Sequence, residues 1–157
     1  GVGSGVNGQT PICWRGIENP YGNVAEYAIG INASNVDNTY KIISRKGTSS
    51  NTLSATLAGG TYEAGTGVLP STSGAFVSNI QAEELGALAL IPSAVNGSSS
   101  TYLCDLYTAP AANPSICTTG GSWNKGSYAG ITHRSFGGGA SFSNTKAGCR
   151  IEYIPQA

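Results

Sequence analysis

Charged residues are scarce in this chain, and their scarcity excludes several classes of protein. Only 10% of the 157 residues are charged, eight basic and eight acidic, so the net charge is zero with the single histidine neutral. Nucleic-acid-binding proteins need clustered lysine and arginine, so we expect no nucleic-acid partner. No apolar run approaches the roughly 18–20 residues of a membrane span, so we expect no membrane insertion. Methionine is absent and the first residue is Gly1, which suggests a processed chain or a piece of a longer one.

Small polar residues take the place of the missing charged ones. Gly, Ser, Thr and Asn make up 68 of the 157 residues. Hydrophobic residues still reach 39%, which argues against a disordered chain. The length suits one domain with a core of its own. We therefore expect a single loop-rich β domain over residues 11–157, preceded by a glycine-rich linker or N-terminal arm over residues 1–10.

Short apolar stretches separated by turn-forming residues predict many short strands. They are expected over residues 12–15, 24–31, 40–43, 53–57, 61–62, 76–77, 101–107 and 148–154. Only residues 81–90 place apolar side chains at helical spacing, and they predict one short helix. Gly22-Asn23 is typical of a tight turn with positive φ before a strand. Gly120-Gly121 allows two backbone segments to approach closely, which would let Trp123 lie on the core.

The four cysteines form no CxxC pair and are accompanied by one histidine, so we expect no zinc site. Two disulfides are possible. Cys104 and Cys117 flank a loop that contains proline and are the preferred pair, which leaves Cys13 with Cys149. The alternative is four buried thiols, because cysteine often behaves as a small apolar group. Disulfides would place the chain outside a reducing cytosol.

Three segments have an unusual spacing of glycine, tryptophan and asparagine. They are residues 14–27, with Gly-Ile-Glu-Asn-Pro-Tyr-Gly-Asn-Val, residues 120–130, with Gly-Gly-Ser-Trp-Asn-Lys-Gly, and Gly148-Cys149-Arg150. A central region adds Pro92, Asn-Gly-Ser-Ser at 96–99 and Cys-Asp-Leu-Tyr at 104–107. Together they resemble the C-type-lectin-like domain of the formylglycine-generating-enzyme type, and most closely its non-enzymatic phage branch. Residues 121–150 are also similar to the variable domain of phage tropism determinants.

This resemblance covers about residues 13–155 and implies the fold class. The expected fold is α+β and C-type-lectin-like, with short twisted antiparallel strands, many loops and little helix. The strand over residues 120–123 and the strand over residues 148–154 are expected in one sheet. Trp14 and Trp123 are expected in the core, as large aromatic residues usually are. Glu18, Glu26 and Arg150 are expected to form a buried ion pair or network.

The departures from the family pattern argue against catalysis. The enzymes of this family need two reactive cysteines just after the Gly-Gly-Ser segment, and Lys125 and Gly130 stand there in this chain. Without a thiol there is neither a nucleophile nor a copper ligand. A calcium-dependent sugar site is not expected, because Lys125 replaces the needed carboxylate and the acidic residues are dispersed. His133, the lone histidine, has no serine in a Gly-x-Ser-x-Gly elbow to activate. We expect no enzyme activity and no cofactor.

Residues 125–142 mix small spacers with basic and aromatic side chains, which is typical of adaptable binding surfaces. The resemblance to tropism determinants implies receptor contacts in this same stretch. The expected binding residues are Lys125, Tyr128, His133, Arg134, Phe136 and Phe142. The alternative is that Phe136 and Phe142 belong to the core and that the remainder is a solvated loop.

The expected function is a binding module on the surface of a virion, on a fibre or spike of a bacteriophage. Its expected partners are a host cell-surface receptor, protein or glycan, and other virion subunits, including further copies of the chain. The expected location is therefore extracellular. The alternatives are a structural capsid or tail decoration protein and a bacterial surface adhesin, because a fold does not fix a function.

Overall fold

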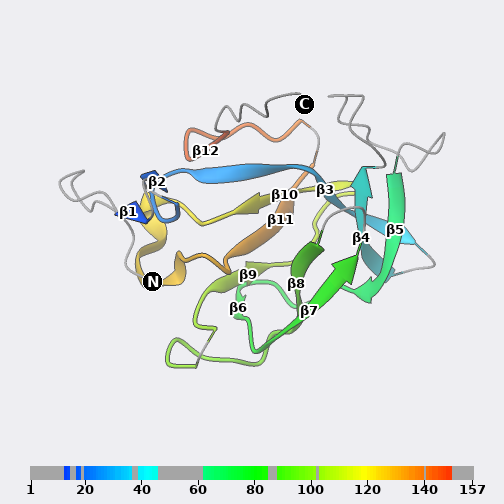
Figure 1. The fold of residues 1–157 in the computed structure, drawn as a ribbon, viewed down its shortest axis with the longest axis horizontal. Helices are drawn as coiled ribbons and strands as arrows, with labels where there is room; N and C mark the ends of the chain where they lie inside the picture. Colours follow the sequence, from blue (N-terminus) through cyan, green and yellow to red (C-terminus); the bar gives the residue numbers. More distant parts are fainter. Residues whose placement is uncertain are drawn as a thin grey trace.

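The computed structural model describes residues 13–14, 17–18, 20–36, 39–45, 62–84, 88–101, 103–139 and 141–149 (Figure 1). The arm expected over residues 1–10 and the strand expected over residues 53–57 lie outside these ranges. So does most of the strand expected over residues 148–154. Within the described ranges, no helix is both long enough and apolar enough to cross a bilayer.

Eight of the twelve described strands form one sheet. Its strands are β3 (Ala25–Val36), β4 (Thr39–Arg45), β5 (Tyr62–Val68), β6 (Ala75–Phe76), β9 (Leu106–Thr108), β10 (Ser115–Thr119), β11 (Arg134–Gly138) and β12 (Ala147–Gly148). Their order is β5-β4-β3-β10-β11-β9-β6, and β12 also pairs with β3. In Figure 1 the sheet runs from β12 and β3 at the top, through β10 and β11, to β9 and β6 below. The sheet is mixed, because β9 with β11 and β12 with β3 are parallel pairs.

The remaining strands form two small sheets. β1 (Cys13–Trp14) pairs with β2 (Ile17–Glu18), and β7 (Asn79–Glu84) pairs with β8 (Leu88–Ala94), both antiparallel. A short 3-10 segment, η2 (Trp123–Tyr128), is the only helical element among the described residues. The expected β-rich, loop-rich chain with very little helix is therefore confirmed at this level.

The helix expected over residues 81–90 is wrong, because most of these residues belong to the β7–β8 hairpin. Gln81 pairs with Ile91, and Ala82 pairs with Leu90. A short apolar run fits a buried strand as well as a helix, so its spacing alone cannot decide between them. Tertiary packing decides here, since Ile91 and Pro92 are buried in the folded chain.

The paired glycines end β10 rather than continue it as a strand to residue 123. Gly120 and Gly121 have φ of 80° and 69°, a conformation that glycine adopts without strain. A side chain at Gly120 would come within 3.2 Å of the Tyr21 backbone. The close approach of two backbone segments is therefore confirmed, and Gly22, with φ of 77°, makes the expected turn. The expected strand over residues 120–123 is wrong.

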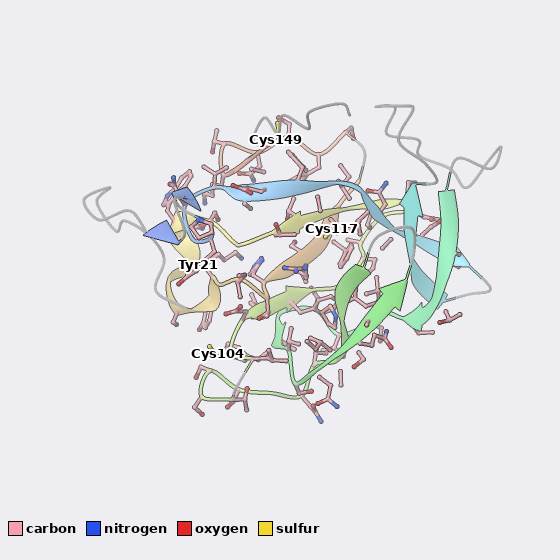
Figure 2. The ribbon with its side chains drawn as sticks, viewed as in Figure 1. Tyr21, Cys104, Cys117 and Cys149 are labelled. Carbon is pink, nitrogen blue, oxygen red and sulfur yellow. The ribbon has the colours of Figure 1, made fainter. Side chains whose placement is uncertain are left out.

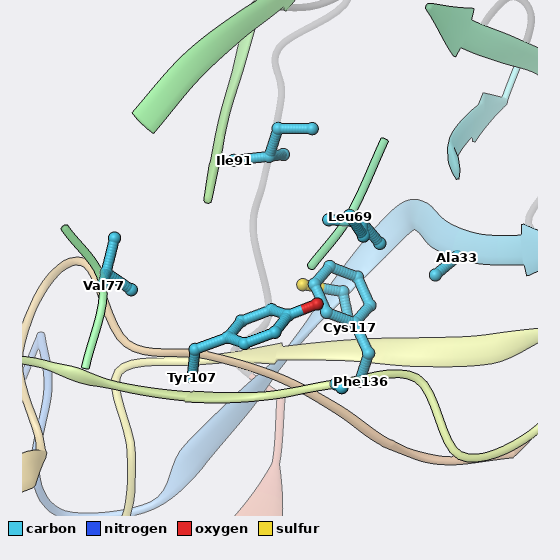
Figure 3. Close-up of a cluster of buried hydrophobic side chains, with 8 residues drawn as sticks. Ala33, Leu69, Val77, Ile91, Tyr107, Cys117 and Phe136 are labelled. Atoms are coloured by element: carbon cyan, nitrogen blue, oxygen red, sulfur yellow. The ribbon is translucent and has the colours of Figure 1, made fainter. Parts of the chain in front are cut away.

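The hydrophobic core lies over β9, β10 and β11. Tyr107, Phe136 and Cys117 come from these three strands and pack together, with the Tyr107 and Phe136 ring centroids 6.3 Å apart (Figure 3). Tyr107 donates a hydrogen bond from its hydroxyl to the Pro70 carbonyl at 2.9 Å. Burial raises the pKa of Tyr107. The core is completed by Ala33, Leu69, Val77, Ile91 and Ala109.

No disulfide joins Cys104, Cys117 or Cys149 to another cysteine, so the expected Cys104–Cys117 bond is absent, as is the expected bond to Cys149. Figure 2 shows the three cysteines in separate parts of the chain. β11 lies between β9 and β10, which puts the strand after Cys104 about 9–10 Å from the strand of Cys117. A disulfide spans only about 7 Å between Cα atoms. The argument from disulfides to an oxidising compartment therefore has no support here.

We predict that Phe136→Ala lowers the free energy of unfolding by about 3–5 kcal/mol, the usual cost of truncating a core aromatic residue. Phe136 is fully buried. Chemical denaturation measures the change. Ile131→Ala is the control, because Ile131 is 67% exposed and its truncation should cost less than about 1 kcal/mol. Equal losses in the two variants would contradict the assignment of Phe136 to the core.

We predict that the cysteines differ in reactivity toward a thiol reagent. Cys149 is exposed and should react at once, whereas Cys117 should react only after unfolding. Burial raises the pKa of the Cys117 thiol to about 12, against a weaker lowering effect of Arg134, so almost no thiolate forms at neutral pH. Peptide mass spectrometry of labelled protein measures the order. A peptide that links Cys104 to Cys117 without added oxidant would contradict this prediction.

Candidate functional site

A cleft of about 240 Å³ opens beside β10 and β11 and is the best candidate for a functional site. Five parts of the chain line it: Ala25 at the start of β3, Thr118 of β10, the segment from Gly121 into η2, the beginning of β11, and residues 142–147, which lead into β12. The larger polar and aromatic side chains in its lining are those of Asn124, Lys125, His133, Phe142, Asn144 and Lys146. We refer to this site as the cleft.

Backbone hydrogen bonds hold the walls of the cleft together. The Gly22 N–H donates to the Gly120 carbonyl at 3.0 Å, and the Trp123 N–H donates to the Asn23 carbonyl at 2.9 Å. The Ala25 N–H donates to the Lys146 carbonyl at 2.8 Å. Residues near 22–25, 120–123 and 146 are far apart in sequence and adjacent in the fold. The bonds are between main-chain groups, so they leave the lining side chains available.

His133 lies in the floor of the cleft and is the most unusual group in it. Its side chain is 2% exposed, and neither Nδ1 nor Nε2 has a hydrogen-bond partner among the described residues. Burial lowers the pKa of His133 to about 4, assisted by Lys125 and Arg134 and opposed by Asp105. The imidazole is therefore neutral at pH 7, with one ring nitrogen able to donate and the other able to accept.

Asp105 fixes the loop that presents His133. Its carboxylate accepts hydrogen bonds from the Thr132 N–H at 2.8 Å and the Thr132 hydroxyl at 2.5 Å. Gly130 is needed beside it, because a side chain there would collide with the Asp105 carboxylate. Arg134 adds two bonds from its Nη1 to the Ile131 and His133 carbonyls, each 2.9 Å long. The loop is therefore held rigidly from both sides.

An aromatic rim borders the cleft. Phe142 is 40% exposed and lines it directly. Trp123 is 39% exposed, and its ring lies 5.8 Å from the Lys146 ammonium. The expectation that Trp123 is a core residue is therefore wrong: the turn at Gly120-Gly121 carries it to the surface. The side chains of Trp14, Glu18 and Arg150 lie outside the described residues, so the expected ion network stays a prediction.

The six expected binding residues divide into three groups. Lys125, His133 and Phe142 meet at the cleft. Arg134 donates hydrogen bonds to two backbone carbonyls. Tyr128 packs edge-on against Phe76, with ring centroids 5.4 Å apart. Phe136 is a core residue, because strand β11 turns it inward; its expected place in the binding patch is wrong.

Sequence reasoning missed three polar residues of the cleft: Asn124, Asn144 and Lys146. Asn124 stands inside the motif over residues 120–130, but that motif assigned it no role in binding. Its Oδ1 accepts a hydrogen bond from the Ser122 hydroxyl at 2.7 Å. Asn144 and Lys146 precede the Gly-Cys-Arg segment and carried no signal of their own. Only the pairing of β12 with β3 reveals their position.

Within the described part of the chain, no three His, Cys, Asp or Glu residues gather as metal ligands would. The described lining of the cleft contains two lysines and no acidic residue. What these side chains offer is hydrogen-bond donors, positive charge and an apolar wall.

No protein family, curated protein or solved structure matches this chain.

We predict that His133 titrates near pH 4 rather than near 6.5. In the unfolded chain the imidazole takes up a proton near pH 6.5, whereas in the folded chain it does so only near pH 4. The free energy of unfolding is therefore highest above pH 6.5 and falls as the pH is lowered toward 4. Between pH 7 and pH 5 the expected loss is about 2 kcal/mol. As His133 is the one histidine in the chain, a single imidazole NMR signal reports the titration. A midpoint near 6.5 would contradict the burial of the ring.

Proposed function

We propose that this chain is a non-enzymatic binding module with a C-type-lectin-like fold, carried on the surface of a virion, and that it recognises a host-surface ligand through the cleft. The observation that carries the proposal is the cleft itself. It combines two lysines, an exposed aromatic side chain and a buried imidazole that has no hydrogen-bond partner among the described residues, on a framework held by backbone hydrogen bonds.

The contacts among the motif segments support the family resemblance. Gly22 bonds to Gly120, which joins the first motif segment to the second. Glu26 pairs with Gly148 in the register of β3 and β12, which joins the first segment to the third. Residues that carry one family pattern are expected to meet in space when they define one fold. This agreement favours the C-type-lectin-like fold over a chance similarity of short motifs.

The chemistry of the cleft favours binding over catalysis. A neutral histidine acts as a general base when a nucleophile and an orienting acid stand beside it. The described lining of the cleft supplies no cysteine and no carboxylate. Asp105 directs its carboxylate to Thr132 instead.

The exposed apolar side chains favour a second candidate function. Trp123, Tyr128, Ile131 and Phe142 are all at least 39% exposed, and such side chains suit a contact face toward neighbouring subunits. A capsid or tail decoration protein would use them in this way. A bacterial adhesin would bind its host-surface ligand through the cleft, in the same way as the proposed virion module.

The two functions are separated by particles that carry a Lys125→Gln/Phe142→Ala chain. We expect their rate of adsorption to host cells to fall by about tenfold or more, because both changes remove cleft contacts. Assembly and thermal stability should be unchanged. Lys41→Gln/Ile131→Ala is the matched control. Lys41 pairs with Ser34, nine residues along β3 from the cleft residue Ala25, and Ile131 is 67% exposed and is not among the described lining. Normal adsorption of the cleft variant would overturn the receptor role and favour decoration.

A further inference from the structure

We propose that the cleft binds a saccharide unit that bears a carboxylate, a uronic acid, as the part of the host-surface ligand that this domain reads. This inference rests on the proposed binding function and adds the chemical class of the ligand. Three features of the cleft lead to it: the sign of its charge, the direction of its hydrogen bonds, and its size.

The charge of the cleft selects an anion. Lys125 and Lys146 line it, and no acidic residue stands among its described lining. In a chain of zero net charge, two lysines on one small concave surface are a local excess of positive charge. A partly enclosed anion gains charge-assisted hydrogen bonds there that a neutral ligand lacks.

The side-chain amides of the cleft are arranged as donors. The Asn124 Oδ1 accepts from the Ser122 hydroxyl at 2.7 Å, and the Asn144 Oδ1 accepts from the Lys146 N–H at 2.9 Å. Each amide therefore turns its NH₂ group away from these bonds, and that group is the one left for a ligand. Together with the two ammonium groups, they call for a ligand with many acceptor oxygens.

His133 needs a ligand group that can both donate and accept hydrogen bonds. Its two ring nitrogens are buried without hydrogen bonds among the described residues, and a buried polar group without a partner is costly. A neutral imidazole offers one donor and one acceptor. Neighbouring hydroxyl groups, which both donate and accept, satisfy such a ring, whereas a simple carboxylate such as acetate supplies acceptors alone. The imidazole thus favours a hydroxylated anion.

The size and the apolar wall fit one sugar ring. The cleft measures about 240 Å³, smaller than the roughly 300–1,000 Å³ of sites for drug-sized ligands. Phe142, Ala25 and Ala147 supply apolar surface along it. A pyranose ring has such a face, because its C–H groups gather on one side while its hydroxyls point outward.

The test is a titration of the purified chain with sodium glucuronate, followed by the His133 imidazole NMR signal. Glucose, acetate and inorganic phosphate are titrated in parallel under the same salt. We expect glucuronate to bind about tenfold more tightly than each of the three, since only it combines a carboxylate with ring hydroxyls. If acetate or phosphate bound as tightly as glucuronate, the proposal that the ligand is a saccharide would be wrong. If glucose bound as tightly, the proposal that the ligand bears a carboxylate would be wrong.

Variants locate the site. Lys125→Gln and Lys146→Gln should each weaken glucuronate by about tenfold, and Lys125→Arg should restore most of the affinity because it keeps the charge. Lys41→Gln should change the affinity less than about twofold, because Lys41 pairs with Ser34, nine residues along β3 from the cleft residue Ala25. If Lys146→Gln lowers the melting temperature by releasing Trp123, the two Lys125 variants decide alone. Unchanged affinity in Lys125→Gln would overturn the proposed site.

The failure of this inference is distinguishable from the failure of the proposed function. Particles that lose adsorption with the cleft variant, while the chain ignores glucuronate, would leave a receptor site for a ligand of another class. Glucuronate binding that depends on Lys125, with normal adsorption of the cleft variant, would leave a saccharide site without a receptor role.

Discussion

The packing of Tyr107 against Phe136 and Cys117 is the contact on which the rest of the described structure depends. It links side chains from the neighbouring strands β10, β11 and β9 of one sheet. β9 and β11 are a parallel pair, which no tight turn could align. Once Phe136 is fixed inward, strand β11 has one register, since a shift by one residue would turn its apolar side chain to solvent. The position of His133, immediately before β11, follows from that register.

Asp105 connects the aromatic core to the loop that carries His133 into the cleft. It lies two residues before Tyr107, so the strand that anchors the core also carries the carboxylate that holds Thr132. The adjoining loop has little choice of conformation, because Gly130 fits against Asp105 only without a side chain. His133 is thereby buried without a hydrogen-bond partner in the described chain, at a cost to stability. A folded protein keeps such a group where the cost is offset by function.

The sequence predicted local features well and long-range contacts poorly. The turn at Gly22 and the close approach at Gly120 were predictable, because glycine there is dictated by backbone conformation. β3 and β4 were predictable from their apolar and aromatic content. The β7–β8 hairpin was not, since the run around Leu90 suits helix and strand alike until Ile91 finds the core.

The errors in the candidate site have the same origin. In a glycine-rich segment, the sequence pattern does not show whether an aromatic residue is buried or exposed. Trp123 was expected in the core and is exposed, whereas Phe136 was expected on the binding surface and is buried. The pairing of Cys104 with Cys117 followed from their nearness in sequence, whereas β11 separates their strands in the sheet. Lys146 was missed because its approach to the cleft depends on β12 pairing with β3, a contact across more than a hundred residues.

The way the cleft is held separates its stability from its specificity. Its walls are joined by main-chain hydrogen bonds at Gly22, Asn23 and Ala25. Thr118 and Ser135 line it from β10 and β11, and their chain neighbours Cys117 and Phe136 belong to the core. Main-chain bonds do not depend on the side chains that they position. The exposed side chains of Asn124, Phe142 and Asn144 can therefore be exchanged at little cost to the fold, while each exchange alters the hydrogen bonds or the apolar surface that the cleft offers. This arrangement agrees with the proposed binding function, because the side chains assigned to the ligand are not the side chains that keep the chain folded.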